Sequence, residues 1–201
     1  ALFINNELFK KNERCDLRVI KMNNWSRDLK FNETEYPWVP TSPHVPFHET
    51  PFYMVATGIL GELGIFSVGV GYTIPFQVIA APWIESDIIA DKMNELELKG
   101  VFFRPINFTP YYSLYEGQSI GGVQIHIEDL ENVNLFSIQF HFLQIHNILY
   151  PDKNAFELAS NSNIVMFDKA IGSTQLRMKI AKTNDYNAIK HIVCLLYTSP
   201  S

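Results

Sequence analysis

The feature that most constrains this fold is a run of prolines at the start of the stretch from Tyr36 to Trp83. The prolines recur every three to five residues, at Pro37, Pro40, Pro43, Pro46 and Pro51. Each proline fixes its backbone φ angle and removes a hydrogen-bond donor, so the run cannot form a regular helix or an inner strand. Aromatic and valine residues are interleaved with the prolines, and disordered linkers rarely carry so much apolar surface. Because long ordered loops in compact domains are usually functional, we predict that this loop forms the wall of a binding site.

The composition excludes several classes of protein. None of the apolar runs in the 201 residues is long enough to span a bilayer. A formal net charge of -5 argues against nucleic acid or an anionic membrane surface as a partner. The two cysteines, Cys15 and Cys194, neither form a disulfide framework nor have metal-site spacing. No metal site is predicted, because no cysteine or carboxylate completes a ligand set around the histidines.

Hydrophobic periodicity predicts an α/β fold class. Helices are predicted over 3–11, 54–63, 87–96, 133–149 and 173–182, and strands over 16–22, 76–80, 101–105 and 122–127. Thr50 and Pro51 give a helix start, and Ser86 is predicted to cap the helix over 87–96. The helix and strand within residues 3–22 form half of an α/β unit, which predicts that a doubly wound sheet precedes them.

The chain is expected to be a piece of a longer protein with two parts. It opens on Ala1 within a helical pattern, and a domain boundary is predicted near residue 98. Residues 194–201 continue no periodicity and are predicted to be a non-native tail.

Glu62 is the candidate catalytic residue, because it ends an apolar segment flanked by glycines. A carboxyl group buried there would suit acid chemistry or binding of sugar hydroxyls; a solvated glutamate at a helix end is the alternative. Glycoside hydrolysis needs two carboxylates, and Glu49, Glu85 and Glu116 are available as a second one. Their positions in the sequence do not pair any of them with Glu62.

For each of two histidines, the sequence allows both a structural and a functional interpretation. His44, in the proline run, is either a substrate contact or a surface residue. His126 alternates with Val123, Ile125 and Ile127 on a predicted strand and is expected to face away from the core, more as a structural residue than as a catalyst. The glycines from Gly64 to Gly71 lack the strand, helix and lysine of a phosphate-binding loop.

Six ordered segments resemble the NamZ family of exo-β-N-acetylmuramidases. They are WVPTSPHVP (38–46), TGILGELG (57–64), GVGYTIPF (69–76), APWI (81–84), GVFFRPINFTP (100–110) and GGVQIHIED (121–129). The resemblance runs from about residue 1 to 182 and covers the C-terminal half of the family.

This resemblance implies a glycosidase that releases N-acetylmuramic acid from the non-reducing end of peptidoglycan fragments, without a cofactor or metal. It implies that residues 1–98 are the C-terminal part of a Rossmann-like catalytic domain with cleft loops, and that 99–193 are a small α/β domain. The implied substrate is a muropeptide-derived saccharide, and the implied location is extracytoplasmic. The segments that match the cleft contain Thr41, Ser42, His44, Glu62, Tyr72 and Thr73, and the motif of the second domain contains Gly121, Gly122, Gln124 and His126.

The sequence also departs from the family pattern. Val68 and Val70 stand where many relatives have a glutamate and an arginine. The family segment with the candidate catalytic glutamate belongs to the N-terminal half, so we expect the 201 residues alone to be inactive. A non-catalytic saccharide-binding module is the alternative; a nucleotide-binding Rossmann protein is disfavoured by the missing phosphate fingerprint.

Overall fold

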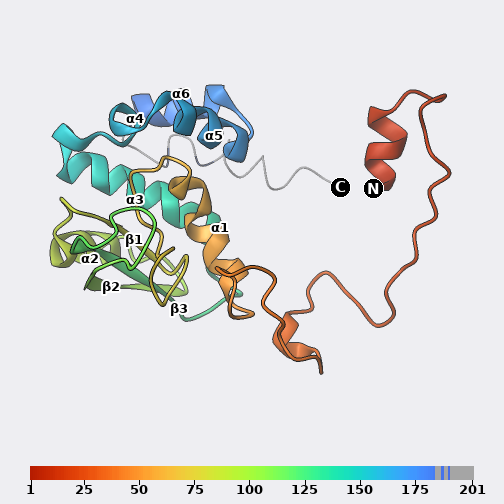
Figure 1. Ribbon diagram of the computed structural model, residues 1–201, viewed down its shortest axis with the longest axis horizontal. Helices are drawn as coiled ribbons and strands as arrows, with labels where there is room; N and C mark the ends of the chain where they lie inside the picture. Colours follow the sequence, from red (N-terminus) through yellow and green to blue (C-terminus); the bar gives the residue numbers. More distant parts are fainter. Residues whose placement is uncertain (184–186, 188–189, 191–201) are drawn as a thin grey trace. The chain divides into compact units, whose positions relative to one another are not determined.

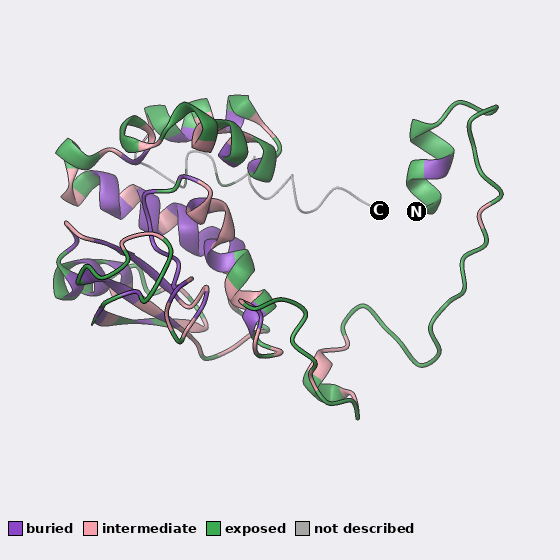
Figure 2. Cartoon of the chain, in the orientation of Figure 1, coloured by how far each residue is buried: buried purple, intermediate pink, exposed green. Residues whose placement is uncertain are grey.

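The computed structural model describes residues 1–183, 187 and 190, and the chain divides into two units, Ala1–Trp38 and Val39–Ser201. The first unit contains a short π-helix, Ile4–Leu8, and a 3-10 turn, Phe31–Glu33. Most of its side chains are exposed (Figure 2). The Phe31 ring packs edge-on against Trp38, with ring centroids 4.9 Å apart. Residues 194–201, the predicted non-native tail, lie outside the described residues.

The strand predicted over 16–22 is wrong. The segment forms no regular secondary structure and pairs with no other described segment, and Val19 and Ile20 are 49% and 86% exposed. A strand is stable only when neighbouring strands satisfy its backbone groups and cover its apolar face. The predicted helix over 3–11 is likewise shortened to the single π-helical turn.

The second unit is a mixed α/β domain, which confirms the predicted fold class (Figure 1). Its elements are α1 (Thr50–Gly61), β1 (Val78–Ala81), α2 (Ser86–Asn94), β2 (Val101–Phe108), β3 (Ile120–Ile127), α3 (Leu135–Leu149), a 3-10 turn (Pro151–Lys153), α4 (Ala155–Leu158), α5 (Asn161–Ile171) and α6 (Thr174–Lys182). Helix α3 lies between the layer of the sheet with α2 and the layer of α4, α5 and α6. No helix in the described part of the chain is long and apolar enough to cross a membrane.

Most of the predicted elements of this unit are confirmed, with two differences. Helix α5 was not predicted, although Ser160 caps it by accepting a hydrogen bond from the Asn163 amide. Ser86 does not cap α2. It is the first residue of the helix, and its hydroxyl accepts a hydrogen bond from Asn107 Nδ2 at 2.9 Å instead, which ties α2 to β2.

The sheet is antiparallel, with strand order β1-β3-β2. Gln124 in the central strand faces Val78 on one side and Arg104 on the other. Pro105 is tolerated because β2 is an edge strand of the described sheet. Gly122 is required because a Cβ there would collide with the carbonyl oxygen of Ile79. The predicted boundary near residue 98 falls inside this sheet, since β1 before it and β2 after it both pair with β3.

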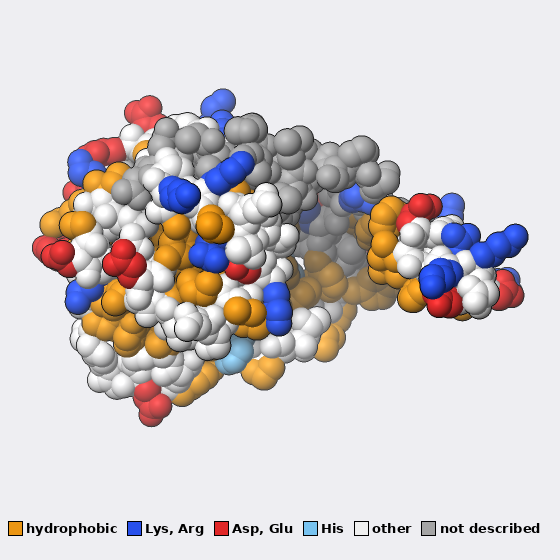
Figure 3. Space-filling view, turned by 90° about the horizontal axis from the view of Figure 1, so that it is seen from above, with side chains coloured by type: hydrophobic (Ala, Val, Ile, Leu, Met, Phe, Trp, Pro, Cys, Tyr) orange, Lys and Arg blue, Asp and Glu red, His pale blue; other side chains and the backbone are white. Residues whose placement is uncertain are grey.

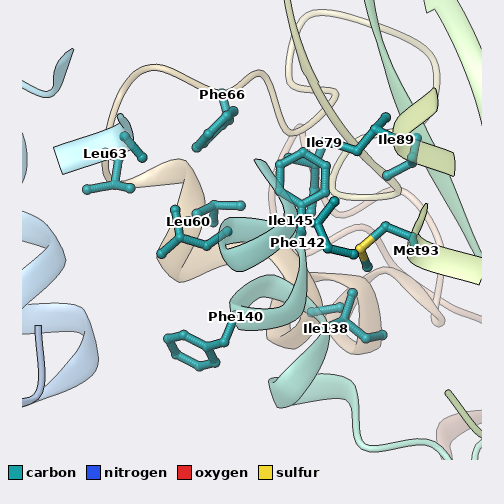
Figure 4. Close-up of a cluster of buried hydrophobic side chains, with 14 of the residues drawn as sticks. Leu60, Leu63, Phe66, Ile79, Ile89, Met93, Ile138, Phe140, Phe142 and Ile145 are labelled. Atoms are coloured by element: carbon teal, nitrogen blue, oxygen red, sulfur yellow. The ribbon is translucent and has the colours of Figure 1, made fainter. Parts of the chain in front are cut away.

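The two faces of the sheet have different coverings. One face packs on α1, α2 and α3 to form the main core, which includes Leu60, Phe66, Ile79, Met93, Ile138 and Phe142 (Figure 4). The opposite face carries a smaller apolar cluster of Val78, Ala80, Ile106, Phe108 and Ile120. Tyr72 and Ile74, from the loop before β1, cover this second cluster. We call this second side the loop-covered face.

Gln139 joins α3 to α1 through two hydrogen bonds. Its side chain is 1% exposed; the Oε1 atom accepts from the Leu60 amide at 3.1 Å, and the Nε2 atom donates to the Val55 carbonyl at 3.0 Å. A buried amide with both ends satisfied fixes the position of its partner along the helix axis. These bonds set the register of α1 against α3.

The outward-facing side of α4, α5 and α6 has a mixed surface. Basic, acidic and hydrophobic side chains are interspersed there (Figure 3). Exposed apolar residues of α5 and α6 include Val165, Met166 and Met178.

His146 is a fully buried histidine held in its neutral form. Trp83 Nε1 donates to His146 Nε2 at 3.0 Å, so the ring proton lies on Nδ1, which is 3.1 Å from Asn147 Oδ1. Burial lowers the pKa of His146 from 6.5 to about 4, against the opposing effect of the bond to Asn147.

We therefore predict that the protein loses stability in mild acid. The unfolded chain takes up a proton at His146 below pH 6.5, whereas the folded chain does so only near pH 4. This difference destabilises the fold by about 3 kcal/mol as the pH falls across that window. Urea unfolding at several pH values measures the effect. His146→Gln is expected to reduce the pH dependence and to leave the part that comes from His141, whose pKa burial also lowers to about 4. An equally steep dependence in the variant would remove His146 as its cause.

Candidate functional site

The pocket that contains Glu62 lies between the C-terminal half of α1 and two loops, 64–77 and 109–118. Its volume is about 330 Å³. It is lined by Gly58, Gly61, Glu62, Gly64, Phe66, Ser67, Val68, Val70, Phe76, Ser113 and Leu114. Glu62 is the one carboxylate in this lining, and the other side chains are apolar or carry a hydroxyl.

Two glycines of α1 contribute backbone rather than side chains to the pocket. A Cβ on Gly58 would meet nothing within 4 Å, so the helix surface there is open. A Cβ on Gly61 would lie 3.3 Å from the γ carbons of Val68, so loop 64–77 sits directly against the helix. Glycine in a helix interior costs stability relative to alanine. At Gly58 this loss of stability is accompanied by an open space on the helix surface that a side chain would fill.

The backbone of Glu62 is fixed by α5. Glu62 follows the last residue of α1, and its carbonyl accepts a hydrogen bond from Asn163 Nδ2 at 2.9 Å. Gly64 turns the chain away with a φ of 66°, and a Cβ there would collide with the Asn163 side chain. The Glu62 side chain is half-buried, and none of residues 1–183, 187 or 190 binds its carboxylate. The structure thus holds the backbone and leaves the carboxylate available to a ligand.

Loop 64–77 is fastened to α1 and to loop 109–118. The Thr57 hydroxyl donates to the Phe76 carbonyl at 3.1 Å, and the Phe76 amide donates to the Val68 carbonyl at 2.6 Å. The Tyr111 amide donates to the Gly71 carbonyl at 2.8 Å. Gly71 must be glycine, because a Cβ there would collide with the carbonyl oxygen of Tyr112 in loop 109–118. The pocket walls are therefore positioned by backbone hydrogen bonds.

The proline loop reaches the same loop through His44. The Nδ1 atom of its half-buried ring lies 3.4 Å from the Tyr112 hydroxyl. Ser42 turns the loop by accepting a hydrogen bond from the Val45 amide at 3.0 Å, and both Thr41 and Ser42 are exposed. Of the three residues predicted from the WVPTSPHVP segment, His44 thus contacts loop 109–118, and none of the three lines the Glu62 pocket.

Tyr72 has a packing role in the structure. Its ring lies 4.6 Å from Phe108 and stacks on Tyr111 at 6.1 Å between ring centroids, over the loop-covered face of the sheet. Thr73 beside it is exposed. Gln124 and His126 lie on the same face of β3, as predicted for His126, and Gln124 accepts a hydrogen bond from Arg104.

The predicted site residues therefore fall into three neighbourhoods. Glu62 lies in the pocket, His44 of the proline loop lies at loop 109–118, and Tyr72, Gln124 and His126 lie on the loop-covered face. The other candidate carboxylates lie outside the pocket lining: Glu49 pairs with His48 at 3.1 Å, and the Glu85 amide binds the Tyr150 hydroxyl. Within the described residues, no group of three or more His, Cys, Asp or Glu side chains is placed to hold a metal ion.

Sequence reasoning missed the residues that shape the pocket from a distance. Asn163 lies 101 residues after the Glu62 carbonyl that it binds, and Ser113 and Leu114 lie in a loop that had no periodic signal. A usable signal was present in the glycines at positions 58, 61 and 64. Their spacing of three places them on one side of the chain near the end of α1.

Comparison with known proteins identifies the relatives of this chain. Residues 52–193 match the family model described as exo-beta-N-acetylmuramidase NamZ, C-terminal, and residues 1–49 match the corresponding N-terminal model. The peptidoglycan beta-N-acetylmuramidase NamZ of Bacillus subtilis (strain 168) is 36% identical over 166 residues, which are 83% of this chain and 39% of the relative.

A solved structure agrees with the sequence match. The crystal structure of a DUF1343 family protein from Bacteroides fragilis superposes with a TM-score of 0.88 at 40% identity, and the match covers 94% of this chain and 49% of that one. The chain thus spans less than half the length of each of these relatives. From the two family models and these two similarities, the chain belongs to the NamZ family.

Proposed function

We propose that this protein is a glycoside hydrolase that releases N-acetylmuramic acid from the non-reducing end of peptidoglycan fragments. Membership of the NamZ family supports the substrate class, because a relative bears the name of that activity. The observation that carries the assignment to a site is Glu62, a half-buried carboxylate that no described residue binds and that opens into a pocket of about 330 Å³.

The pocket matches the chemistry of one sugar ring. Its volume lies at the small end of the range of roughly 300–1,000 Å³ that ligand pockets occupy. Val68 and Phe76 supply apolar surface for the ring face, and Ser113 and Glu62 supply hydrogen-bonding groups for the hydroxyls. The open backbone at Gly58 leaves room for an acyl substituent on the ring.

The proposed role of Glu62 is to bind a sugar hydroxyl or to assist as the second carboxylate of the reaction. Glycoside hydrolysis needs two carboxyl groups about the scissile bond and no cofactor. Because the pocket lining holds a single carboxylate, we assign the other to the N-terminal part of the family. Since peptidoglycan lies outside the cytoplasmic membrane, we also propose an extracytoplasmic site of action.

The single carboxylate also favours a second candidate, a saccharide-binding module without activity. In that case the pocket would bind the sugar while the protein carrying it released none. Val68 and Val70 both line the pocket, and they stand where the resemblance places a glutamate and an arginine. Two apolar residues in place of two charged ones support this alternative. The first experiment below separates the two.

The direct test joins the N-terminal part of the Bacillus subtilis relative to residues 50–201 of this chain. We expect this chimera to release N-acetylmuramic acid from a chromogenic glycoside, and Glu62→Gln to lower kcat/KM by about 100-fold, because a positioned carboxyl group typically contributes 10²–10⁴-fold. Glu157→Gln, at an exposed position on α4, is the matched control and should leave the rate unchanged.

Three results are informative. Equal rates for Glu62→Gln and the control would exclude Glu62 from any direct role. Binding of the disaccharide by calorimetry without turnover of the unmodified chimera would favour the binding module. Neither binding nor turnover in a folded chimera would overturn both candidate functions.

Gly58 provides a test in which stability and binding change in opposite directions. Gly58→Ala should stabilise the fold by up to about 1 kcal/mol, because alanine is the better helix former and its Cβ meets no atom within 4 Å. The same methyl group enters the pocket, so affinity for the disaccharide should fall. Urea unfolding and calorimetry measure the two effects.

Gly58→Leu extends this test with a larger side chain at the same position. Its affinity should fall below that of the alanine variant while the protein remains folded. Unchanged affinity in both variants would show that the saccharide binds elsewhere.

A further inference from the structure

Tyr72 and Ile74 cover the apolar cluster on the loop-covered face of the sheet. The same face also carries four other side chains, Phe102 and Arg104 from β2 and Gln124 and His126 from β3. Arg104 faces Gln124 across the strands, and Phe102 faces His126. Side chains at facing positions of an antiparallel pair lie on one side of the sheet, and diagonal neighbours remain within reach of one another. We call these four residues the Arg104 cluster. Val78, which faces Gln124 from β1, lies two residues after Phe76 of the Glu62 pocket.

Arg104 is a positioned cation without a countercharge. Its Nε atom donates to Gln124 Oε1 at 3.1 Å, and its Nη2 atom donates to the same oxygen. No carboxylate of residues 1–183 lies within 4 Å of the guanidinium, although it is exposed and belongs to a protein of net charge -5. Gln124 orients the guanidinium but leaves its charge uncompensated. Such a group favours a carboxylate or another planar anion as its ligand.

His126 adds an unsatisfied polar atom to the cluster. Its Nε2 atom is buried and has no hydrogen-bond partner in the described part of the chain. Buried polar atoms in native proteins are nearly always hydrogen-bonded, and an exception calls for an explanation such as a missing ligand. His126 lies diagonally opposite Arg104, so one bound group could contact both.

Phe102 supplies an apolar surface at the same place. Its side chain is 45% exposed on the strand position that faces His126. An aromatic ring beside a cation and a hydrogen-bonding atom suits a ligand with an apolar face and an anionic substituent. Sugar acids have this combination.

We propose that the Arg104 cluster is a carboxylate-binding site, distinct from the Glu62 pocket, and that the carboxylate it takes is that of an N-acetylmuramic acid residue. This sugar differs from N-acetylglucosamine by a lactyl ether that carries one carboxylate, and that charge is the feature that Arg104 can recognise. Arg104 is the specificity-determining residue, Gln124 is a positioning residue, and His126 is a second hydrogen-bonding group. The identity of the sugar rests on the proposed function, whereas the preference for a carboxylate rests on the cluster itself.

The experiment measures both parts separately on the 201-residue chain. First, sodium lactate, which reproduces the anionic substituent alone, is titrated while the NMR signals of the Arg104 Nε–H group and the His126 ring are followed. Saturable shifts are expected, and Arg104→Gln should abolish the shift at His126.

Second, calorimetry compares N-acetylmuramic acid with its methyl ester. The acid is expected to bind about tenfold more tightly, as for a hydrogen bond to a charged group, and Arg104→Gln should remove this preference.

Lys153→Gln is the matched control, because it removes the same charge from an exposed position of the same unit. It should retain the lactate shifts and the preference for the acid. No response to lactate, or an undiminished preference in Arg104→Gln, would overturn the proposal even if the sugar binds. A lactate response without any binding of the sugar would instead support the carboxylate site and count against the proposed function.

Discussion

The hydrogen bonds of Gln139 are the interaction on which the site geometry depends. This side chain is buried between α1 and α3 and binds the Leu60 amide and the Val55 carbonyl. Two bonds from one rigid amide fix α1 along its axis as well as against its neighbour. Because Gly58 lies in the last turn of α1 and Glu62 directly follows the helix, the position of these two pocket residues follows from this contact. An apolar residue in place of Gln139 could fill the space but could not set the register.

From this fixed helix the pocket is built mainly from backbone. The loops that close it are held by the Thr57 hydroxyl and by amide and carbonyl groups of Gly71 and Phe76, and Asn163 binds the carbonyl of Glu62. Side chains facing the pocket can therefore differ among relatives without loss of its shape.

Local patterns predicted the parts of the fold that depend on local order. The apolar stripe of α3, the strands β2 and β3 and the α/β class all follow from periodicity, and the alternation around His126 correctly placed it opposite the main core. The strand expected over 16–22 failed because its apolar pattern says nothing about whether partner strands are present. Helix α5 was missed although local signals mark both of its ends: Ser160 caps its start, and Gly172 ends it in the left-handed conformation.

The candidate site was predictable only in part, for the same reason. Glu62 could be singled out from its flanking glycines, but its fixation by Asn163 joins residues 101 positions apart. His44 was expected to contact substrate, and its pairing with Tyr112 depends on a fold that brings two loops together. Arg104 carried no signal of its own, because an arginine on a strand is common and its lack of a countercharge appears only in three dimensions.

The central claim is that the Glu62 pocket receives the sugar. The most direct measurement is a crystal structure of this chain with N-acetylmuramic acid bound. The account predicts a sugar ring against Val68 and Phe76, with a hydroxyl within about 3.2 Å of the Glu62 carboxylate. A sugar bound elsewhere, with the pocket filled by solvent and Glu62 without contact to it, would contradict the account.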